Sequence, residues 1–189
     1  KGEVAIQGKP VRFDRPDDAI RSGVALLTSD RKASGLVLPL SVAANATLAD
    51  LPRLARGGWR RPRLEDRAAR SLAERLKIRA ASLDMPVGEL SGGNQQKVAL
   101  AKWVQTDPQV LLLDEPTRGI DINAKREIYS LIEGWKTEGM AILLITSELP
   151  ELMLLCDRIL VMHRGRVVSE MSREEADADR VVQAAMNVA

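Results

Sequence analysis

Apolar and polar residues alternate at the start of the chain. The alternation runs over residues 2–13 and is interrupted by Gly8-Lys9-Pro10, which predicts a short hairpin with its turn at those three residues. Residues 16–22 read as a short helix, and Gly23 is expected to end it. The apolar run over residues 24–28 then predicts a buried strand.

From about residue 40 to residue 104 the pattern is helical instead. Four apolar residues recur every four positions, with Arg and Glu between them: Leu64, Ala68, Leu72 and Leu76. This spacing places the four on one face of an amphipathic helix. A loop rich in Gly, Arg and Pro, residues 55–63, precedes it. We therefore expect a helical subdomain over residues 41–105.

After Asp107-Pro108 the chain changes to apolar runs separated by helical stretches. The predicted strands are residues 110–113, 141–146 and 158–162, and the predicted helices lie near residues 124–136 and 150–155. Continuous apolar strands of this kind are typical of a parallel sheet that is covered on both faces. A hairpin is expected at 163–166, and Ser172 with Glu175 forms a capping-box pattern that predicts a terminal helix.

Composition narrows the class of protein. The 189 residues are 45% hydrophobic but only 3% aromatic, so the core must be aliphatic, as is common in α/β folds. The net charge of +2 favours no particular partner. The only cysteine, Cys156, lies in an apolar run, and a single cysteine excludes an internal disulfide.

Two adjacent carboxylates, Asp114 and Glu115, follow the first apolar strand after residue 107. The carboxyl edge of a parallel sheet is where such sheets bind ligands. There Asp114 could hold Mg²⁺, an ion that prefers oxygen ligands, and Glu115 could polarise a water that attacks a phosphate. The alternative is an acidic strand end, with an Asp that caps a helix.

A second motif, Ser91-Gly92-Gly93, opens a stretch of good helix formers. Two glycines allow backbone N–H groups to approach a ligand closely, and a helix N-terminus carries partial positive charge. The motif therefore has the properties of an anion seat. An ordinary helix N-cap is the alternative. A seat about twenty residues ahead of a strand that ends in Asp-Glu favours phosphate chemistry.

Together these motifs resemble one family. LSGGNQQK (90–97) resembles the signature of ABC-type ATPases, VLLLDEP (110–116) their Walker B strand, and TRGID (117–121) their D-loop. The combination is similar to the second nucleotide-binding half of the duplicated ATPases of bacterial monosaccharide importers, of ribose, galactose or xylose type. The resemblance implies an α/β fold, with a P-loop-type core sheet over 1–40 and 106–189 that is incomplete at its N-terminus, and an inserted α-helical subdomain over 41–105.

The resemblance also implies a set of roles and partners. The implied cofactors are ATP and Mg²⁺, with Asp114 on the metal and Glu115 as the catalytic base. The implied nucleotide contacts are Ser91, Gly92, Gly93, Gln95, Asp121 and Ser147. The implied partners are another nucleotide-binding half, transmembrane permease subunits and, indirectly, a periplasmic sugar-binding protein, at the cytoplasmic face of the bacterial inner membrane. Nucleic acid is not among the implied partners.

The sequence departs from the family pattern in three ways. No G-x-x-x-x-G-K-[ST] phosphate loop is present, because Gly2 and Gly8 are separated by five residues and Pro10 stands where a hydroxyl is needed. The resemblance places that loop before Lys1. Ser147 stands where a switch histidine is expected, and TSDRK (28–32) replaces the usual glutamine. These losses imply asymmetric sites, one hydrolytic and one that mainly binds nucleotide.

Two other functions remain open. The chain could be a degenerate half that only gates a partner's site, which the serine at 147 favours. It could instead belong to an ABC ATPase that acts on nucleic acid, since several arginines surround Trp59, namely Arg53, Arg56, Arg60, Arg61 and Arg63. A solvated loop of the helical subdomain is the favoured explanation of that cluster, because so small a patch on a nearly neutral chain provides little field. Neither the sugar nor the activity of this chain alone follows from the sequence.

Overall fold

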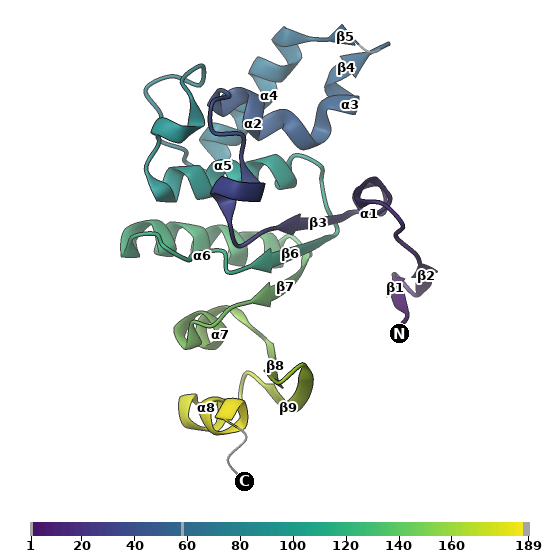
Figure 1. Cartoon of the computed structure of the whole chain (residues 1–189), viewed down its shortest axis with the longest axis vertical. Coiled ribbons are helices and arrows are strands. Elements are labelled where there is room, and N and C mark those ends of the chain that lie inside the picture. Colours follow the sequence, from purple (N-terminus) through teal and green to yellow (C-terminus); the bar gives the residue numbers. More distant parts are fainter. Residues whose placement is uncertain (1, 58, 187–189) are drawn as a thin grey trace. The chain divides into compact units, whose positions relative to one another are not determined.

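The apolar run before Asp114 forms the centre of a three-stranded sheet. In the computed structural model, which describes residues 2–57 and 59–186, β3 (Val24–Leu27) pairs in parallel with β6 (Val110–Asp114). β7 (Ala141–Ile145) follows in the order β3-β6-β7 (Figure 1). The chain divides into two compact units, residues 1–143 and 144–189. This agrees with the α/β class and the predicted strands.

The two faces of this sheet differ in burial among the described residues. Alternate side chains of β3 and β6 are at most 2% exposed, namely Ala25, Leu27, Leu111 and Leu113. On the alternate positions Leu26 is 43% exposed and Leu143 of β7 is 51% exposed. The prediction of a sheet covered on both faces is therefore not met at Leu26 and Leu143, where about half of each side chain stays exposed.

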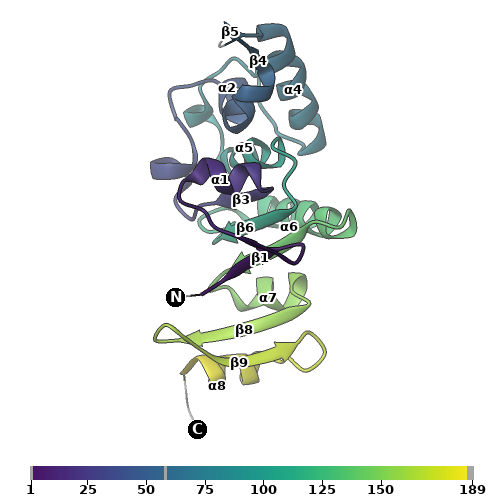
Figure 2. The same ribbon diagram turned by 90° about the vertical axis from the view of Figure 1, so that its right-hand side faces the viewer.

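Helix α5 (Gly92–Val104) is the centre of the first unit. Ser91 is its N-cap, and ten of its 13 residues are buried. It packs against β3 and against α2 (Val42–Thr47) and α4 (Pro62–Arg75). The last two helices lie above it in Figure 2. Because this helix is surrounded on most sides, it lacks the one-sided apolar stripe of a surface helix.

The predicted helical region is present. Leu72 of α4 and Leu76, the C-cap of α4, are both buried, as the i, i+4 pattern predicts. α2 is followed by η2 (Leu48–Asp50), α3 (Leu51–Leu54) and, after α4, η3 (Val87–Glu89). The expected loop at 55–63 instead contains a small hairpin, in which β4 (Ala55–Arg56) pairs with β5 (Trp59–Arg60).

The N-terminal hairpin forms, but its turn differs from the prediction. β1 (Val4–Ile6) pairs with β2 (Lys9–Val11), and the two residues between them are Gln7 and Gly8. Both have positive φ, 51° and 73°, which two-residue hairpin turns of type I′ require. Lys9 and Pro10 therefore belong to the second strand. α1 (Pro16–Arg21) follows and ends before Gly23 as expected.

Two further helical elements complete the first unit. η1 (Arg31–Gly35) is a single π-helical turn after β3, capped by Asp30. α6 (Ile122–Thr137) follows β6, begins at the N-cap Asp121 and buries Ile128, Ile132 and Trp135. The predicted helix near 124–136 is thus confirmed, while η1 was not predicted, since five residues carry too little periodicity.

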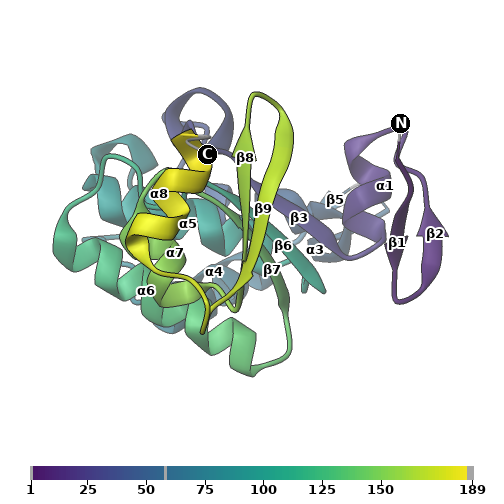
Figure 3. The ribbon, with the colours of Figure 1, turned by 90° about the horizontal axis from the view of Figure 1, so that it is seen from below.

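The second unit contains α7 (Leu149–Leu155), β8 (Arg158–His163), β9 (Arg166–Ser172) and α8 (Ala178–Met186). β8 pairs antiparallel with β9, so the prediction that it belongs to the parallel sheet is wrong. α8 packs on this hairpin, as Figure 3 shows. The core of the unit is Ile159, Val161, Met171, Ala176 and Val181.

The predicted capping box forms without starting the terminal helix. The Ser172 backbone N–H donates to Glu175 Oε2 at 3.1 Å, and the Glu175 N–H donates to Ser172 Oγ at 3.3 Å. This closes one turn, whereas α8 begins at Ala178, after Asp177 accepts from the Arg180 N–H. Ala176 lies between the capping-box turn and α8 and is buried in the core of the β8–β9 hairpin. This burial holds the turn on the hairpin and separates it from the helix.

Within the described part of the chain, no helix has both the length and the apolar character needed to cross a bilayer.

Candidate functional site

The paired carboxylates lie where the sequence places them. Asp114 is the last residue of β6, and Glu115 follows it with φ of 47°. A glutamate in this left-handed region is uncommon, and such outliers cluster at functional turns. The Glu115 carbonyl accepts from the Arg118 N–H at 3.2 Å, which turns the chain at once toward α6. Both side chains are half-buried at the carboxyl end of the strand.

The donor set at this strand end suits one kind of metal site. Among the described residues, no three His, Cys, Asp or Glu side chains come together to hold a metal. Asp114 can supply one carboxylate oxygen, and Mg²⁺ is often bound by one or two carboxylates with water and phosphate oxygens as its other ligands. The residues present therefore fit Mg²⁺ bound with a nucleotide, and do not fit a metal held by the protein alone.

The Ser91 hydroxyl caps α5. Its Oγ accepts from the Asn94 backbone N–H at 3.4 Å and from Asn94 Nδ2 at 3.0 Å. The ordinary N-cap interpretation is therefore correct for this side chain. It does not conflict with an anion seat, because the cap fixes the first turn of the helix whose N–H groups would bind the anion.

The two glycines of the seat have close neighbours. A Cβ on Gly93 would lie closer than 3.0 Å to the Cβ of Ala124, which real Cβ atoms essentially never do. A Cβ on Gly92 would lie 2.9 Å from Nη2 of Arg31 and 3.7 Å from the Gly119 carbonyl. Gly93 is thus required for the packing of α5 on α6, a reason the sequence alone did not supply.

Asp121 is brought to the same place. Its Oδ1 accepts from the backbone N–H groups of Asn123 and Ala124, both at 3.0 Å, so it caps α6. The bond from Ala124 is the main cause that lowers the pKa of Asp121 below its usual value, followed in the same direction by the bond from Asn123. Its Oδ2 lies 3.7 Å from the position of a Gly93 Cβ. The structure therefore joins Ser91–Gly93 and Asp121 into one site.

Gln95 points away from that site. Its Nε2 donates to the carbonyls of Gly88 at 3.2 Å and Leu90 at 3.0 Å, and the residue is 5% exposed. Its Oε1 is buried without a hydrogen-bond partner in the described chain. In this conformation the side chain supports the turn before α5. Ser147, the other predicted contact, lies in the second unit, after β7 and just before Glu148, the N-cap of α7.

A partly buried ion pair fixes α5 against α6. Lys97 of α5 is 1% exposed, and its Nζ pairs with Glu127 of α6 and donates to the Lys77 carbonyl at 2.8 Å. Arg79 adds a second bond to Glu127 at 2.8 Å. The hydrogen bond from Lys97 is the first cause that lowers the pKa of Glu127. The sequence analysis missed this pair, because its members lie thirty residues apart with no motif in common.

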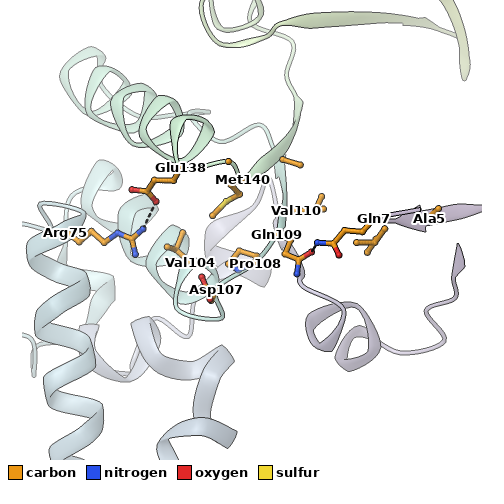
Figure 4. Close-up of a pocket in the computed structure, with 13 residues that line it drawn as sticks. Ala5, Gln7, Arg75, Val104, Asp107, Pro108, Gln109, Val110, Glu138 and Met140 are labelled. Atoms are coloured by element: carbon orange, nitrogen blue, oxygen red, sulfur yellow. Dashed lines mark hydrogen bonds and ion pairs between the residues drawn. The ribbon is translucent and has the colours of Figure 1, made fainter. Parts of the chain in front are cut away.

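A cavity of about 560 Å³ lies away from these residues (Figure 4). Gln109 and Ala141, at the amino ends of β6 and β7, line it, together with Gln7, whose Nε2 donates to Gln109 Oε1 at 2.8 Å. Arg75 and Glu138 form an ion pair at its other side. The cavity is at the opposite end of β6 from Asp114, so it is separate from the site described above.

Comparisons with known proteins identify the family that this chain resembles. A family model described as ABC transporter matches residues 1–118. A ribose import ATP-binding protein of Rhodopirellula baltica is 49% identical over 98% of this chain, and one of Rhodococcus jostii is 47% identical over 97%. A xylose import ATP-binding protein of Geobacillus kaustophilus is 45% identical over 98%. The chain spans 36–37% of the lengths of these relatives.

Solved structures support the same fold. A nucleotide-free ATP-binding cassette from an ABC transporter matches 97% of this chain with a TM-score of 0.80 and 20% identity, and the match covers 76% of that cassette. The ADP conformation of an ATP-binding cassette of an ABC transporter gives the same TM-score over 98% of the chain. The mixed α/β fold is therefore that of an ATP-binding cassette.

Proposed function

Because the chain belongs to the ABC transporter family, we propose that it is the second nucleotide-binding half of the ATP-hydrolysing, energy-coupling subunit of a bacterial sugar importer. The observation that carries the proposal is the meeting of the Ser91–Gly93 seat with Asp121 across the α5–α6 contact. The sugar class is supported by the ribose and xylose import relatives. The sugar itself is left to the permease and the binding protein.

The roles of the carboxylates follow from their position. Asp114 would hold Mg²⁺, which offsets the charge of the nucleotide phosphates when it is bound. Glu115 would accept a proton from the attacking water, and the turn at its positive φ holds its backbone at the strand end. The Ser91–Gly93 N–H groups at the start of α5 would bind a terminal phosphate. Gln95 would act through the turn that it supports. Ser147 would stand at the position of the switch histidine without taking over its role.

The phosphate loop is proposed to come from residues of the longer protein outside these 189. None of the 189 residues forms the G-x-x-x-x-G-K-[ST] motif. The exposed apolar side chains Leu26 and Leu143 support the proposal, since a parallel sheet normally has helices on both faces. Such a segment would cover that face and place its loop at the carboxyl ends of the strands.

The two nucleotide sites of the full protein are proposed to differ. The seat at Ser91–Gly93 would complete a site whose phosphate loop belongs to a partner half, and that site would hydrolyse ATP rapidly. The site of Asp114 and Glu115 would mainly bind nucleotide, because Ser147 cannot replace the imidazole that organises phosphate and water. The protein would act at the cytoplasmic face of the inner membrane with permease subunits and, indirectly, a sugar-binding protein.

Nucleic acid is a weaker candidate partner. Trp59 is 82% exposed in the β4–β5 hairpin, which would suit stacking. However, Arg60 pairs with Glu65, and Arg53 pairs with Asp50 at 3.5 Å. These pairs reduce the positive field that phosphate binding needs.

The experiment uses the longer protein, purified with its permease in proteoliposomes. ATP hydrolysis should rise when the loaded sugar-binding protein is added, and ribose, galactose or xylose should enter the vesicles. Gly93→Asp should abolish both activities while the partner half still binds ATP. Hydrolysis that ignores the sugar and responds to single-stranded nucleic acid would overturn the proposal.

A further inference from the structure

A tryptophan is held in solvent at the end of the helical region. Trp59 of β5 is 82% exposed, more than any other large apolar side chain that the structure describes. Figures 1 and 2 show the β4–β5 hairpin beside the start of α4, away from the three-stranded sheet. A lone exposed apolar side chain is ordinary on a protein surface. The meaning of this one therefore depends on how the hairpin is fixed and on what surrounds the ring.

An ion pair fixes the hairpin to α4. Nε of Arg60, the residue after the tryptophan, donates to both carboxylate oxygens of Glu65, at 3.0 Å and 3.2 Å. Glu65 lies in the first turn of α4 and is only 6% exposed. An arginine that contacts both oxygens of a carboxylate defines the orientation of the pair as well as adding energy. The hairpin is thus attached to the helix while its indole stays in water.

The charge of the chain is concentrated around this hairpin. Residues 53–75 hold eight arginines and three carboxylates, a net charge of +5, whereas the whole chain carries +2. The rest of the chain is therefore slightly acidic. A charge distribution of this kind produces a positive field at one end of the molecule that the net charge does not reveal.

Three of the arginines that follow Trp59 are free of carboxylates. Arg61, Arg63 and Arg67 are exposed, and none of them takes part in an ion pair in the described part of the chain. Arg63 and Arg67 are four residues apart, so they lie on one face of α4, and the buried Leu72 lies on the other. The exposed ring is therefore followed by an exposed stripe of unpaired positive charge.

An exposed indole beside unpaired guanidinium groups suits the surface of an anionic bilayer. Tryptophan is enriched where lipid meets water, because its ring has an apolar body and a polar N–H. Anionic lipids attract basic side chains within about one Debye length, so the local charge decides the interaction and not the charge of the chain. Single-stranded nucleic acid would require several aromatic rings on which successive bases stack. Trp59 is the only aromatic residue between positions 14 and 102.

We propose that Trp59, Arg61, Arg63 and Arg67 form a surface that binds the anionic head groups of a phospholipid bilayer. The indole enters the head-group region, and the guanidinium groups bind lipid phosphates. This tryptophan–arginine surface goes beyond the proposed function, since it requires neither a permease nor ATP hydrolysis.

The first test measures binding of the longer protein, purified without its permease, to sedimented lipid vesicles. Vesicles of phosphatidylcholine with phosphatidylglycerol should bind the protein at low salt, and binding should weaken as salt is added. Vesicles of phosphatidylcholine alone should bind it much less. Equal binding to the two kinds of vesicle, or binding to neither, would overturn the proposal.

The second test assigns the binding to the arginines. One basic residue near an anionic surface changes the partition coefficient about fivefold, so Arg63→Gln with Arg67→Gln should weaken vesicle binding about 20–30-fold. Arg166→Gln with Arg173→Gln is the matched control, because it removes the same charge from exposed side chains of the second unit. Equal affinities for the two double variants would refute the surface. Sugar-stimulated hydrolysis is measured separately in the proteoliposome assay, so this result would leave the proposed function intact.

The third test follows the indole itself. Vesicles with phosphatidylglycerol should shift the tryptophan emission of the protein to shorter wavelength, and Trp59→Phe should remove most of that shift. Trp59→Ala should weaken binding at least about fivefold, because an apolar ring no longer leaves water. Both variants should fold, since the side chain is 82% exposed. A shift that persists in Trp59→Phe, or a single-stranded oligonucleotide that displaces the protein from the vesicles and binds it more tightly, would contradict the assignment to lipid.

Discussion

Gly93→Ala tests whether the seat glycine is required by packing or by the ligand. The new methyl group would lie closer than 3.0 Å to the Cβ of Ala124. Carbon atoms attract optimally at about 3.5–4.0 Å, so α5 and α6 would have to separate by roughly 0.5 Å or more. The pair Lys97–Glu127 holds the same two helices together and resists that separation.

The cost can be worked out from these contacts. Overpacking in a well-packed interior costs about 1–3 kcal/mol, while replacing a helical glycine by alanine returns about 0.5–1 kcal/mol. The net loss is therefore between about 0 and about 2.5 kcal/mol. One kcal/mol shifts Tm by about 2–4 °C in a protein of 150–250 residues, so we expect Tm to fall, by up to about 10 °C.

The assay is thermal unfolding of four variants. Gly134→Ala is the control, because a Cβ there meets nothing within 4 Å, and it should raise Tm by about 1–4 °C. Ala124→Gly removes the obstructing methyl group, so Gly93→Ala combined with Ala124→Gly should be more stable than the sum of the two single changes by about 1 kcal/mol or more. If Gly93→Ala is as harmless as Gly134→Ala, or if the two changes are additive, the packing argument is refuted.

Three further predictions concern charge and nucleotide. Glu127→Gln should lower the free energy of unfolding at pH 7, measured by urea titration. The pKa of Glu127 is lowered in the folded protein, so its carboxylate stabilises the fold fully above the unfolded pKa near 4.5. That stabilisation is lost as pH falls through the folded pKa, so the difference between Glu127→Gln and the unchanged protein should vanish at low pH. A constant deficit down to pH 3 would contradict this. Glu115→Gln in the full transporter should keep more than about half of the phosphate release, whereas the equivalent change in the partner half should remove nearly all of it, on the scale of about 10² to 10⁴ for general-base assistance. Silencing by Glu115→Gln alone would show the site to be hydrolytic. The 189-residue chain alone should bind Mg-ATP weakly in equilibrium dialysis, because the N–H groups of a phosphate loop are lacking, and micromolar affinity would refute this.

The fold followed from the sequence wherever one element carries its own periodicity. α4 and α6 were predictable because their apolar residues recur at helical spacing, and β6 because four successive apolar residues precede a charged pair. The pairing of β8 with β9 was not predictable, because an apolar run does not show which strand it will pair with. The turn at Gln7 and Gly8 was misplaced because its positive φ values depend on the twist of the two strands.

The motif residues of the site could be predicted from the sequence, but the contacts between them could not. Ser91 and Asp121 were found from local patterns, and each proves to cap a helix. The approach of Gly93 to Ala124 and of Arg31 to Gly92 depends on how helices and loops far apart in the chain pack. Arg31 was visible only as part of TSDRK, which replaces a residue that the family pattern expects, and that departure was the one available signal.

The central claim is that Ser91 of this chain faces the phosphate loop of a partner half. It is tested most directly by placing a cysteine at Ser91 and another in the partner half's G-x-x-x-x-G-K-[ST] loop, in a protein whose native cysteines, Cys156 included, are replaced. A short bifunctional thiol reagent should then link the two halves, and bound Mg-ATP should change the yield, because the nucleotide occupies the space between them. A protein in which Ser91→Cys links only to a second copy of itself, or to nothing with and without nucleotide, would contradict the account.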